Sequence, residues 1–214
     1  MHALVLKNVS KSFGGIDAVI KVDLSVTEGE SRALIGPNGA GKTTLFNLVT
    51  GEIPLDEGSI LLFGKDLTRQ PVQKRIASQL GRTYQVSNLF SQLTVQENLF
   101  LASWQTRRRK ASLAATLFRS WYKFENQRRH LAKIAHRVGL EDRLDITVDE
   151  LSHGEHRQLE LGITLAHEPR ILLLDEPMAG LSVAERGSMT ELIMSLKPEI
   201  TVVIIEHDIC LLYT

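Results

Sequence analysis

The segment GPNGAGKTT, Gly36 to Thr44, sets the class of fold that this chain adopts. It matches G-x-x-x-x-G-K-[ST], a pattern in which glycines let backbone amides turn inward around phosphate oxygens. We expect Lys42 to reach the β- and γ-phosphates of a nucleotide and the hydroxyl of Thr43 to bind Mg²⁺. A predicted strand precedes the segment and a predicted helix, from about Lys42 to Thr50, follows it. The segment therefore predicts a phosphate-binding loop at the start of a helix.

Hydrophobic patterns around this loop predict the rest of an α/β fold. Period-two alternation and glycine breaks predict strands at Leu4 to Val9, Val19 to Val26, Ser31 to Gly36 and Gly58 to Gly64. Two continuous aliphatic runs, Arg170 to Pro177 and Ile200 to Asp208, predict parallel strands that are buried on both faces. We therefore predict a nucleotide-binding α/β core of residues 1–93 and 140–214 with a parallel sheet. A helical subdomain of residues 94–139, where the periodicity becomes helical, interrupts it.

Composition excludes several classes of protein. Lys plus Arg and Asp plus Glu number 25 each, so the overall charge favours neither nucleic acid nor an acidic partner. Cys210 is the single cysteine, which rules out an internal disulfide framework and fits a reducing compartment. The N-terminus lacks the layout of a signal peptide, and no apolar run approaches the ~18 residues that cross a bilayer. We expect a soluble chain, or one held at a membrane by a partner.

Two adjacent acids, Asp175 and Glu176, follow the first aliphatic run. On their own they are better explained as a solvated turn. Beside a phosphate-binding loop, Asp175 becomes a second anchor for Mg²⁺, because ligands bind at the carboxyl ends of strands in open parallel sheets. Glu176 then becomes the general base, or polariser, for the attacking water.

Two further polar residues end strands, and both leave two interpretations open. His207 follows the second aliphatic run, where it can orient the attacking water at the γ-phosphate or be an ordinary structural histidine. Gln85 closes a short strand, and its amide can bind Mg²⁺ or hold that water. Alone, Gln85 would be taken as a surface residue.

The segment ELSHGEHRQLELG, Glu150 to Gly162, predicts a helix start. Ser152 is a good N-cap, and Glu155 stands three residues later in the capping-box position. Local chemistry alone explains this segment as structure.

Taken in order, these segments resemble the ATP-binding cassette of ABC transporters, from about Leu4 to Asp208. The base-stacking aromatic matches Phe13, and the D-loop matches Ala179 to Ser182. The signature matches Leu151 to Glu155, the Walker B strand Ile171 to Glu176, the Q-loop Gln85 and the H-loop His207. The Walker A loop comprises Gly36, Pro37, Asn38, Gly39, Ala40, Gly41, Lys42, Thr43 and Thr44. The resemblance also implies antiparallel N-terminal strands beside the parallel sheet.

The resemblance implies an ATPase that uses ATP and Mg²⁺. It assigns catalysis to Glu176, His207 and Gln85, and metal binding to Thr43, Gln85 and Asp175. It places Ser152, Gly154 and Glu155 against the γ-phosphate held by a second cassette in a head-to-tail dimer, where the helix N-terminus favours an anion. The chain departs from the commonest pattern at four positions: Phe13, His153, Glu155 and Ser182.

Within the family, the motifs are most similar to ATPase subunits for branched-chain amino acid uptake, a subgroup with relatives serving urea and other small amides. This implies a second cassette, either identical or a paralogue, membrane-spanning permease subunits and, indirectly, a periplasmic or extracellular substrate-binding protein, but no nucleic acid. The expected location is cytoplasmic, peripheral on the inner face of the cell membrane. Family members usually continue with a helix and strands beyond the position of Thr214, so we expect either that the sequence is truncated or that the gene product lacks that closing segment.

Two other classes of protein fit the sequence less well than a transport ATPase. A soluble ABC ATPase of the repair kind would need a very long coiled coil after Gln85, and the ribosome-associated kind two cassettes per chain. A P-loop kinase or GTPase would leave the signature unexplained, and no N-K-x-D motif is present. Two basic clusters in the helical segment, Thr106 to Lys110 and Asn126 to His130, favour a solvated helix face; contact with anionic headgroups is the alternative.

Overall fold

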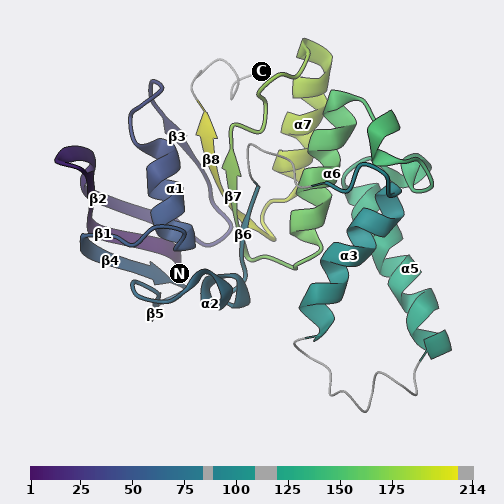
Figure 1. Cartoon of the computed structure of the whole chain (residues 1–214), viewed down its shortest axis with the longest axis horizontal. Helices are drawn as coiled ribbons and strands as arrows, with labels where there is room; N and C mark the ends of the chain where they lie inside the picture. The colour runs from purple at the N-terminus through teal and green to yellow at the C-terminus, as the bar shows by residue number, and fades with distance from the viewer. Residues whose placement is uncertain (84–88, 109–119, 207–214) are drawn as a thin grey trace. The chain divides into compact units, whose positions relative to one another are not determined.

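The computed structural model describes residues 1–83, 89–108 and 120–206 (Figure 1). It divides into two compact units, each described by itself. Within the described ranges, the core unit comprises Met1–Gln85, Pro169–Ala179 and Arg186–Thr214, and the helical unit comprises Val86–Glu168 and Gly180–Glu185. The helical unit of the structure thus contains more of the chain than the predicted residues 94–139.

The core unit contains an antiparallel sheet in the order β2-β1-β4-β5. Strand β1 (His2–Phe13) pairs with β2 (Ile16–Thr27) and with β4 (Glu57–Leu62), which pairs with β5 (Lys65–Asp66). Leu4, Leu6 and Val9 of β1 are buried, and the register shifts between Leu6 and Val9. That irregularity keeps all three side chains on the core side although the spacing changes from two to three.

The core unit also contains a parallel sheet in the order β3-β8-β7-β6 (Figure 1). Its strands are β3 (Ser31–Ile35), β6 (Leu80–Arg82), β7 (Ile171–Asp175) and β8 (Thr201–Glu206). Every residue of β7 and β8 is buried, as the continuous aliphatic runs predict. The register pairs Ile35 with Glu206 and Asp175 with Ile205. The chain therefore leaves β3 towards the phosphate-binding loop at the same sheet edge where β7 ends in Asp175.

Helix α1 (Lys42–Thr50) starts directly after that loop, at the predicted position. Its buried residues Phe46 and Leu48 join a hydrophobic cluster that includes Ile60 of β4, Leu173 of β7 and Val203 of β8. A short helix, α2 (Val72–Ala77), follows the antiparallel sheet. The loop is thus held between a strand and a helix whose inner side is packed.

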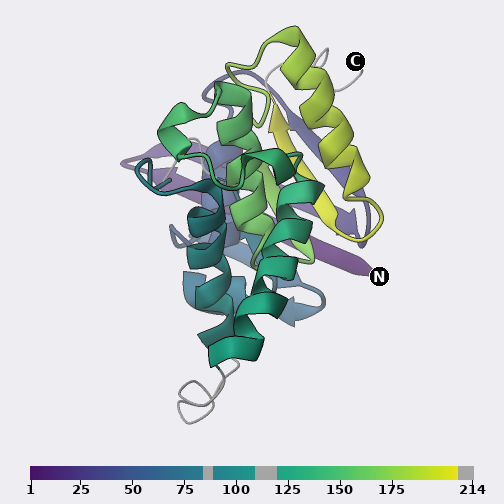
Figure 2. The same cartoon turned by 90° about the vertical axis from the view of Figure 1, so that its right-hand side faces the viewer.

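The helical unit contains α3 (Val95–Arg108), α5 (Ser120–Arg137) and α6 (His153–Leu165), with the short helices η1 (Glu141–Arg143) and η2 (Val148–Glu150). The three long helices lie side by side in both views (Figure 1, Figure 2). A Cβ on Gly162 of α6 would come within 3.3 Å of Leu99 of α3 and Val138, so the helices pack closely there. This packing explains why α6, predicted as part of the core, belongs to the helical unit.

Helix α7 (Val183–Ser195) starts in the helical unit and continues in the core unit. None of the helices in the described ranges combines the length and the apolar character needed to cross a membrane.

Candidate nucleotide site

The phosphate-binding loop has the backbone that its glycines predict. Gly39 and Gly41 have φ angles of +82° and +83°, in the left-handed region that other residues rarely adopt. A Cβ on Gly41 would lie 2.1 Å from the carbonyl oxygen of Ala18 in β2. Gly41 is also the N-cap of α1, and within the described structure no side chain caps this helix. The first-turn amides are therefore available to an anion, which the helix dipole favours.

Lys42 folds back over the loop. Its Nζ donates hydrogen bonds to the carbonyl oxygens of Gly36, at 2.5 Å, and Pro37, at 2.9 Å. Thr43 is exposed, and Thr44 is half-buried. An ammonium group held over a loop of inward amides can exchange these carbonyl oxygens for phosphate oxygens.

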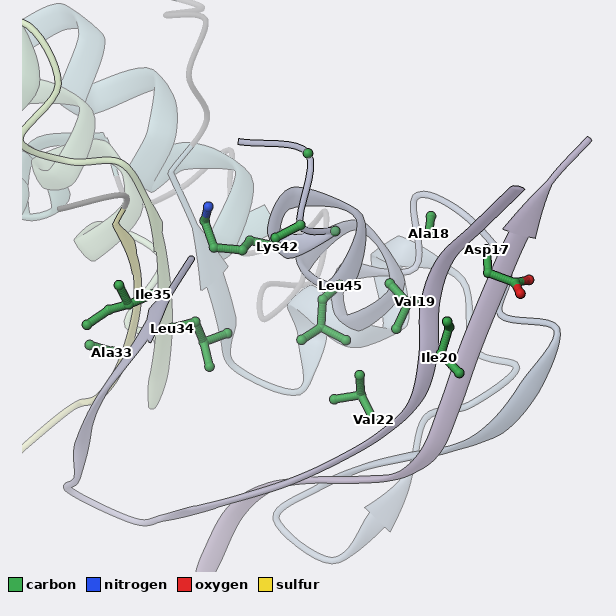
Figure 3. Close-up of a pocket in the computed structure, with 13 residues that line it drawn as sticks. Asp17, Ala18, Val19, Ile20, Val22, Ala33, Leu34, Ile35, Lys42 and Leu45 are labelled. Carbon is green, nitrogen blue, oxygen red and sulfur yellow. The ribbon is translucent and has the colours of Figure 1, made fainter. Parts of the chain in front are cut away.

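A cavity of about 670 Å³ adjoins the loop (Figure 3). Its walls come from β2, β3, the loop and α1, and Figure 3 shows Val19, Val22, Leu34 and Leu45 around the space, with Lys42 at one side. Apolar walls with a few polar groups are typical of small-molecule sites. Phe13 is not among the lining residues: it lies in the same hairpin, half-exposed, with the ammonium of Lys11 5.4 Å from its ring centroid.

Asp175 ends β7 and is only 4% exposed. Its Oδ2 accepts a hydrogen bond of 3.2 Å from Nη2 of Arg82, whereas its Oδ1 is buried without a hydrogen-bond partner among the described residues. Burial raises the pKa of Asp175, and the charge of Arg82 opposes that effect. A buried, bare carboxylate oxygen at the end of β7 fits a hard cation such as Mg²⁺.

Glu176 follows immediately and has a φ angle of +50°. Its backbone amide donates to the carbonyl oxygen of Ile205 in the neighbouring strand β8, at 3.0 Å, which holds this residue against the sheet. A glutamate in the left-handed region is strained, and such strain concentrates at functional sites. The core unit thus brings together the loop, Lys42, Asp175 and Glu176.

Sequence reasoning missed Arg82. The arginine stands three positions before Gln85 at the end of β6, where its sequence neighbours carry no signal of a partner 93 residues away. Gln85 and His207, which the sequence assigns to catalysis, and Gln85 as a metal ligand, lie outside the described residues.

The signature segment lies in the helical unit. The predicted capping box is confirmed: Ser152 Oγ accepts from the amide of Glu155, at 3.2 Å, and Oε2 of Glu155 accepts from the amide of Ser152, at 2.8 Å. Glu155 also accepts from Nε of Arg143, at 2.8 Å. The amide of Gly154 donates to Oε1 of Glu185, at 3.2 Å. Arg143 and Glu185 are two more neighbours that sequence reasoning missed.

The sequence and the fold are both similar to those of known proteins. Residues 19–179 match the family model described as ABC transporter. The chain is 37% identical over 210 residues to the high-affinity branched-chain amino acid transport ATP-binding protein BraF of Pseudomonas aeruginosa, and equally to LivG of Escherichia coli; each alignment covers 96% of this chain and 82% of the relative. Among solved structures, the ADP conformation of MJ1267, an ATP-binding cassette of an ABC transporter, matches with a TM-score of 0.85 and 31% identity, covering 99% of this chain and 83% of that one.

Proposed function

Because the chain belongs to the ABC transporter family, as an ATP-hydrolysing subunit, we propose that it powers the uptake of branched-chain amino acids or related small amides. The bare Oδ1 of Asp175, at the sheet edge that also carries the phosphate-binding loop, is the observation that carries the ATPase chemistry. The names of BraF and LivG support the amino acid substrate. They give no support to a soluble ATPase that is not coupled to transport.

The proposed chemistry follows from the core unit. The loop of residues 36–44 binds the phosphates of ATP through its backbone N–H groups, which Pro37 lacks, and through the ammonium of Lys42, and Phe13 stacks on the base. Thr43, Asp175 and Gln85 would hold Mg²⁺, which neutralises phosphate charge when bound. Glu176 accepts a proton from the attacking water. His207 orients that water at the γ-phosphate.

The signature segment completes the site of a second cassette in this proposal. The hydroxyl of Ser152 and the amide of Gly154 stand at the N-terminus of α6, where a phosphate is favoured, whereas the carboxylate of Glu155 caps the helix and pairs with Arg143. Two cassettes, identical or paralogous, then enclose two ATP molecules. Closing and reopening of this dimer would drive permease subunits at the cytoplasmic face of the membrane, supplied by a substrate-binding protein outside.

The composite site is tested by mixing two inactive variants of the full chain. Lys42→Ala removes the ammonium that binds the phosphates in the variant's own loop. Ser152→Arg puts a large side chain where the phosphate held by the second cassette would bind. Each variant alone should be inactive. Their mixture should recover part of the ATPase rate, because a mixed dimer contains one site built from the intact loop of one chain and the intact signature of the other. A mixture as inactive as its components would contradict the shared site.

Transport is tested separately by reconstituting the chain in vesicles with candidate membrane-spanning permease subunits. Leucine uptake that depends on ATP would support the amino acid substrate. Uptake of urea alone would select the amide alternative.

A further inference from the structure

The guanidinium of Arg82 lies at the centre of a buried network in the core unit. Its side chain is 5% exposed. Nη1 donates to Oδ1 of Asn47 at 2.6 Å, and lies 3.3 Å from Thr50 Oγ1 and from both carboxylate oxygens of Glu52. Nη2 donates to Asp175 Oδ2 at 3.2 Å. The rigid fork of donors therefore joins the end of α1 to the end of β7.

The contact with Asp175 is one-sided. An arginine fork commonly binds both oxygens of a carboxylate, yet here the second arm is held by Asn47 and Glu52. Arg82 therefore engages only Oδ2, and Oδ1 stays buried without a partner among the described residues. A purely structural ion pair would gain by satisfying both oxygens, since a bare buried acceptor destabilises the fold. The arrangement is better explained by a second partner that binds Oδ1.

The two elements that Arg82 joins are those that carry the proposed metal ligands, α1 with Thr43 and β7 with Asp175. We propose that Arg82 is a positioning residue, which holds the Asp175 carboxylate with Oδ1 directed away from the guanidinium and available to the Mg²⁺ that accompanies ATP. Asn47 and Glu52 hold Arg82 in that orientation. This assignment rests on the proposed ATPase function.

The test compares ATP binding with and without the metal. Arg82→Met keeps the length and apolar body of the side chain but removes its charge and donors. Binding of a fluorescent ATP analogue in EDTA should stay close to that of the wild type. The Mg²⁺ concentration that half-saturates the gain in affinity should rise roughly 10- to 100-fold, the range for losing a group that orients a metal ligand. Arg82→Lys should recover part of this loss, because an ammonium can pair with Asp175 but cannot also hold Asn47 and Glu52.

Arg75→Met is the matched control. Arg75 is also an arginine with a buried side chain, and it binds the carbonyl oxygens of Leu48 and Val49 at the same end of α1, but no hydrogen bond or ion pair described for it reaches a carboxylate. The Arg75→Met substitution should lower thermal stability without changing the Mg²⁺ requirement. If Arg82→Met does not fold, Asn47→Ala supplies the measurement, since it loosens Arg82 while keeping its pair with Asp175. A several-fold rise in the Mg²⁺ requirement is expected there.

The outcomes separate the assignment from the function on which it rests. A folded Arg82→Met or, in its place, Asn47→Ala with the wild-type Mg²⁺ requirement would overturn the positioning role alone. Equal losses of ATP affinity in EDTA and in Mg²⁺ would also overturn it, because Arg82 would then only support the fold. A wild type that binds no ATP at all would overturn the proposed function and this assignment together.

Discussion

The backbone amide of Gly154 donates a hydrogen bond of 3.2 Å to Oε1 of Glu185 within the helical unit. The other oxygen of Glu185 accepts from the hydroxyl of Ser182 at 2.6 Å and from its amide at 2.8 Å, and these bonds lower the pKa of Glu185. One carboxylate therefore joins the first turn of α6 to the start of α7. The amide that we propose for phosphate binding holds an anion already, as expected at a helix N-terminus.

Gly154→Ala should disturb this contact, because a Cβ there would lie 2.6 Å from Oε1 of Glu185. The carboxylate is the end of a flexible side chain and can move away, but its hydrogen bond to the amide is then lost, which costs about 1 kcal/mol. That loss should cancel the gain that alanine normally brings to a helix. We expect unchanged stability in urea unfolding and a lower ATPase rate.

Gly187→Ala is the control for that variant. Gly187 lies inside α7, and a Cβ there would meet nothing within 4 Å. Alanine should therefore stabilise the chain by about 0.5–1 kcal/mol and leave hydrolysis unaffected. Equal stabilisation by both substitutions would show that the contact between Gly154 and Glu185 has no energetic importance.

Gly41→Ala should abolish nucleotide binding. The new Cβ would lie 2.1 Å from the carbonyl oxygen of Ala18, a backbone atom that cannot move without shifting β2. Gly39→Ala is the matched control, because its φ angle is nearly the same and its Cβ would meet nothing within 4 Å. Both variants should lose about 1–2 kcal/mol of stability, because alanine is strained in the left-handed region. Only Gly41→Ala should lose more, because only its Cβ clashes with the backbone. Denaturant unfolding and ATP titration separate the two, and equal midpoints would argue against the close packing of the loop on β2.

Glu176→Gln should keep ATP binding and lower turnover by ~10²–10⁴, the usual loss when a general base is removed. The backbone conformation should survive, since the amide bond to Ile205 does not involve the side chain. Glu168→Gln is the control: Glu168 is also a glutamate with positive φ, at +53°, and the change should leave turnover intact. Phosphate release by Glu176→Gln at the wild-type rate would remove Glu176 from the role of base.

Features set by neighbouring residues were predictable from the sequence. The loop at Gly36 to Thr44, the buried strands β7 and β8 and the capping box at Ser152 all depend on short stretches of chain, and the structure has each of them. The roles that we assign to Gln85 and His207 stay predictions.

Features set by tertiary packing were not predictable. Arg82 meets Asp175 across 93 residues and Gly154 meets Glu185 across 31, and neither pairing leaves a local pattern. The wider helical unit has the same origin, because the packing of α6 against α3, close at Gly162 and Leu99, leaves no local pattern in the sequence.

The stability of the chain should fall as the pH drops below neutrality, in part through His167. Burial lowers the pKa of this half-buried histidine from its ordinary value of 6.5. Below 6.5 the unfolded chain therefore binds the proton more readily than the folded chain does, so stability decreases as the pH falls from 6.5 towards the folded pKa. Well above 6.5 the imidazole is neutral in both states and contributes no pH dependence.

His167→Gln should remove that component, because glutamine keeps a polar side chain that does not titrate. Thermal unfolding of both proteins between pH 5 and pH 8, in the absence of nucleotide, gives the difference in midpoint as a function of pH. The difference should be constant above about pH 7. At lower pH the midpoint of the wild type should fall relative to that of the variant, because only the wild type has a histidine that is protonated more readily in the unfolded state. Two midpoint curves that stay parallel over the whole range would show that burial of His167 does not affect its protonation.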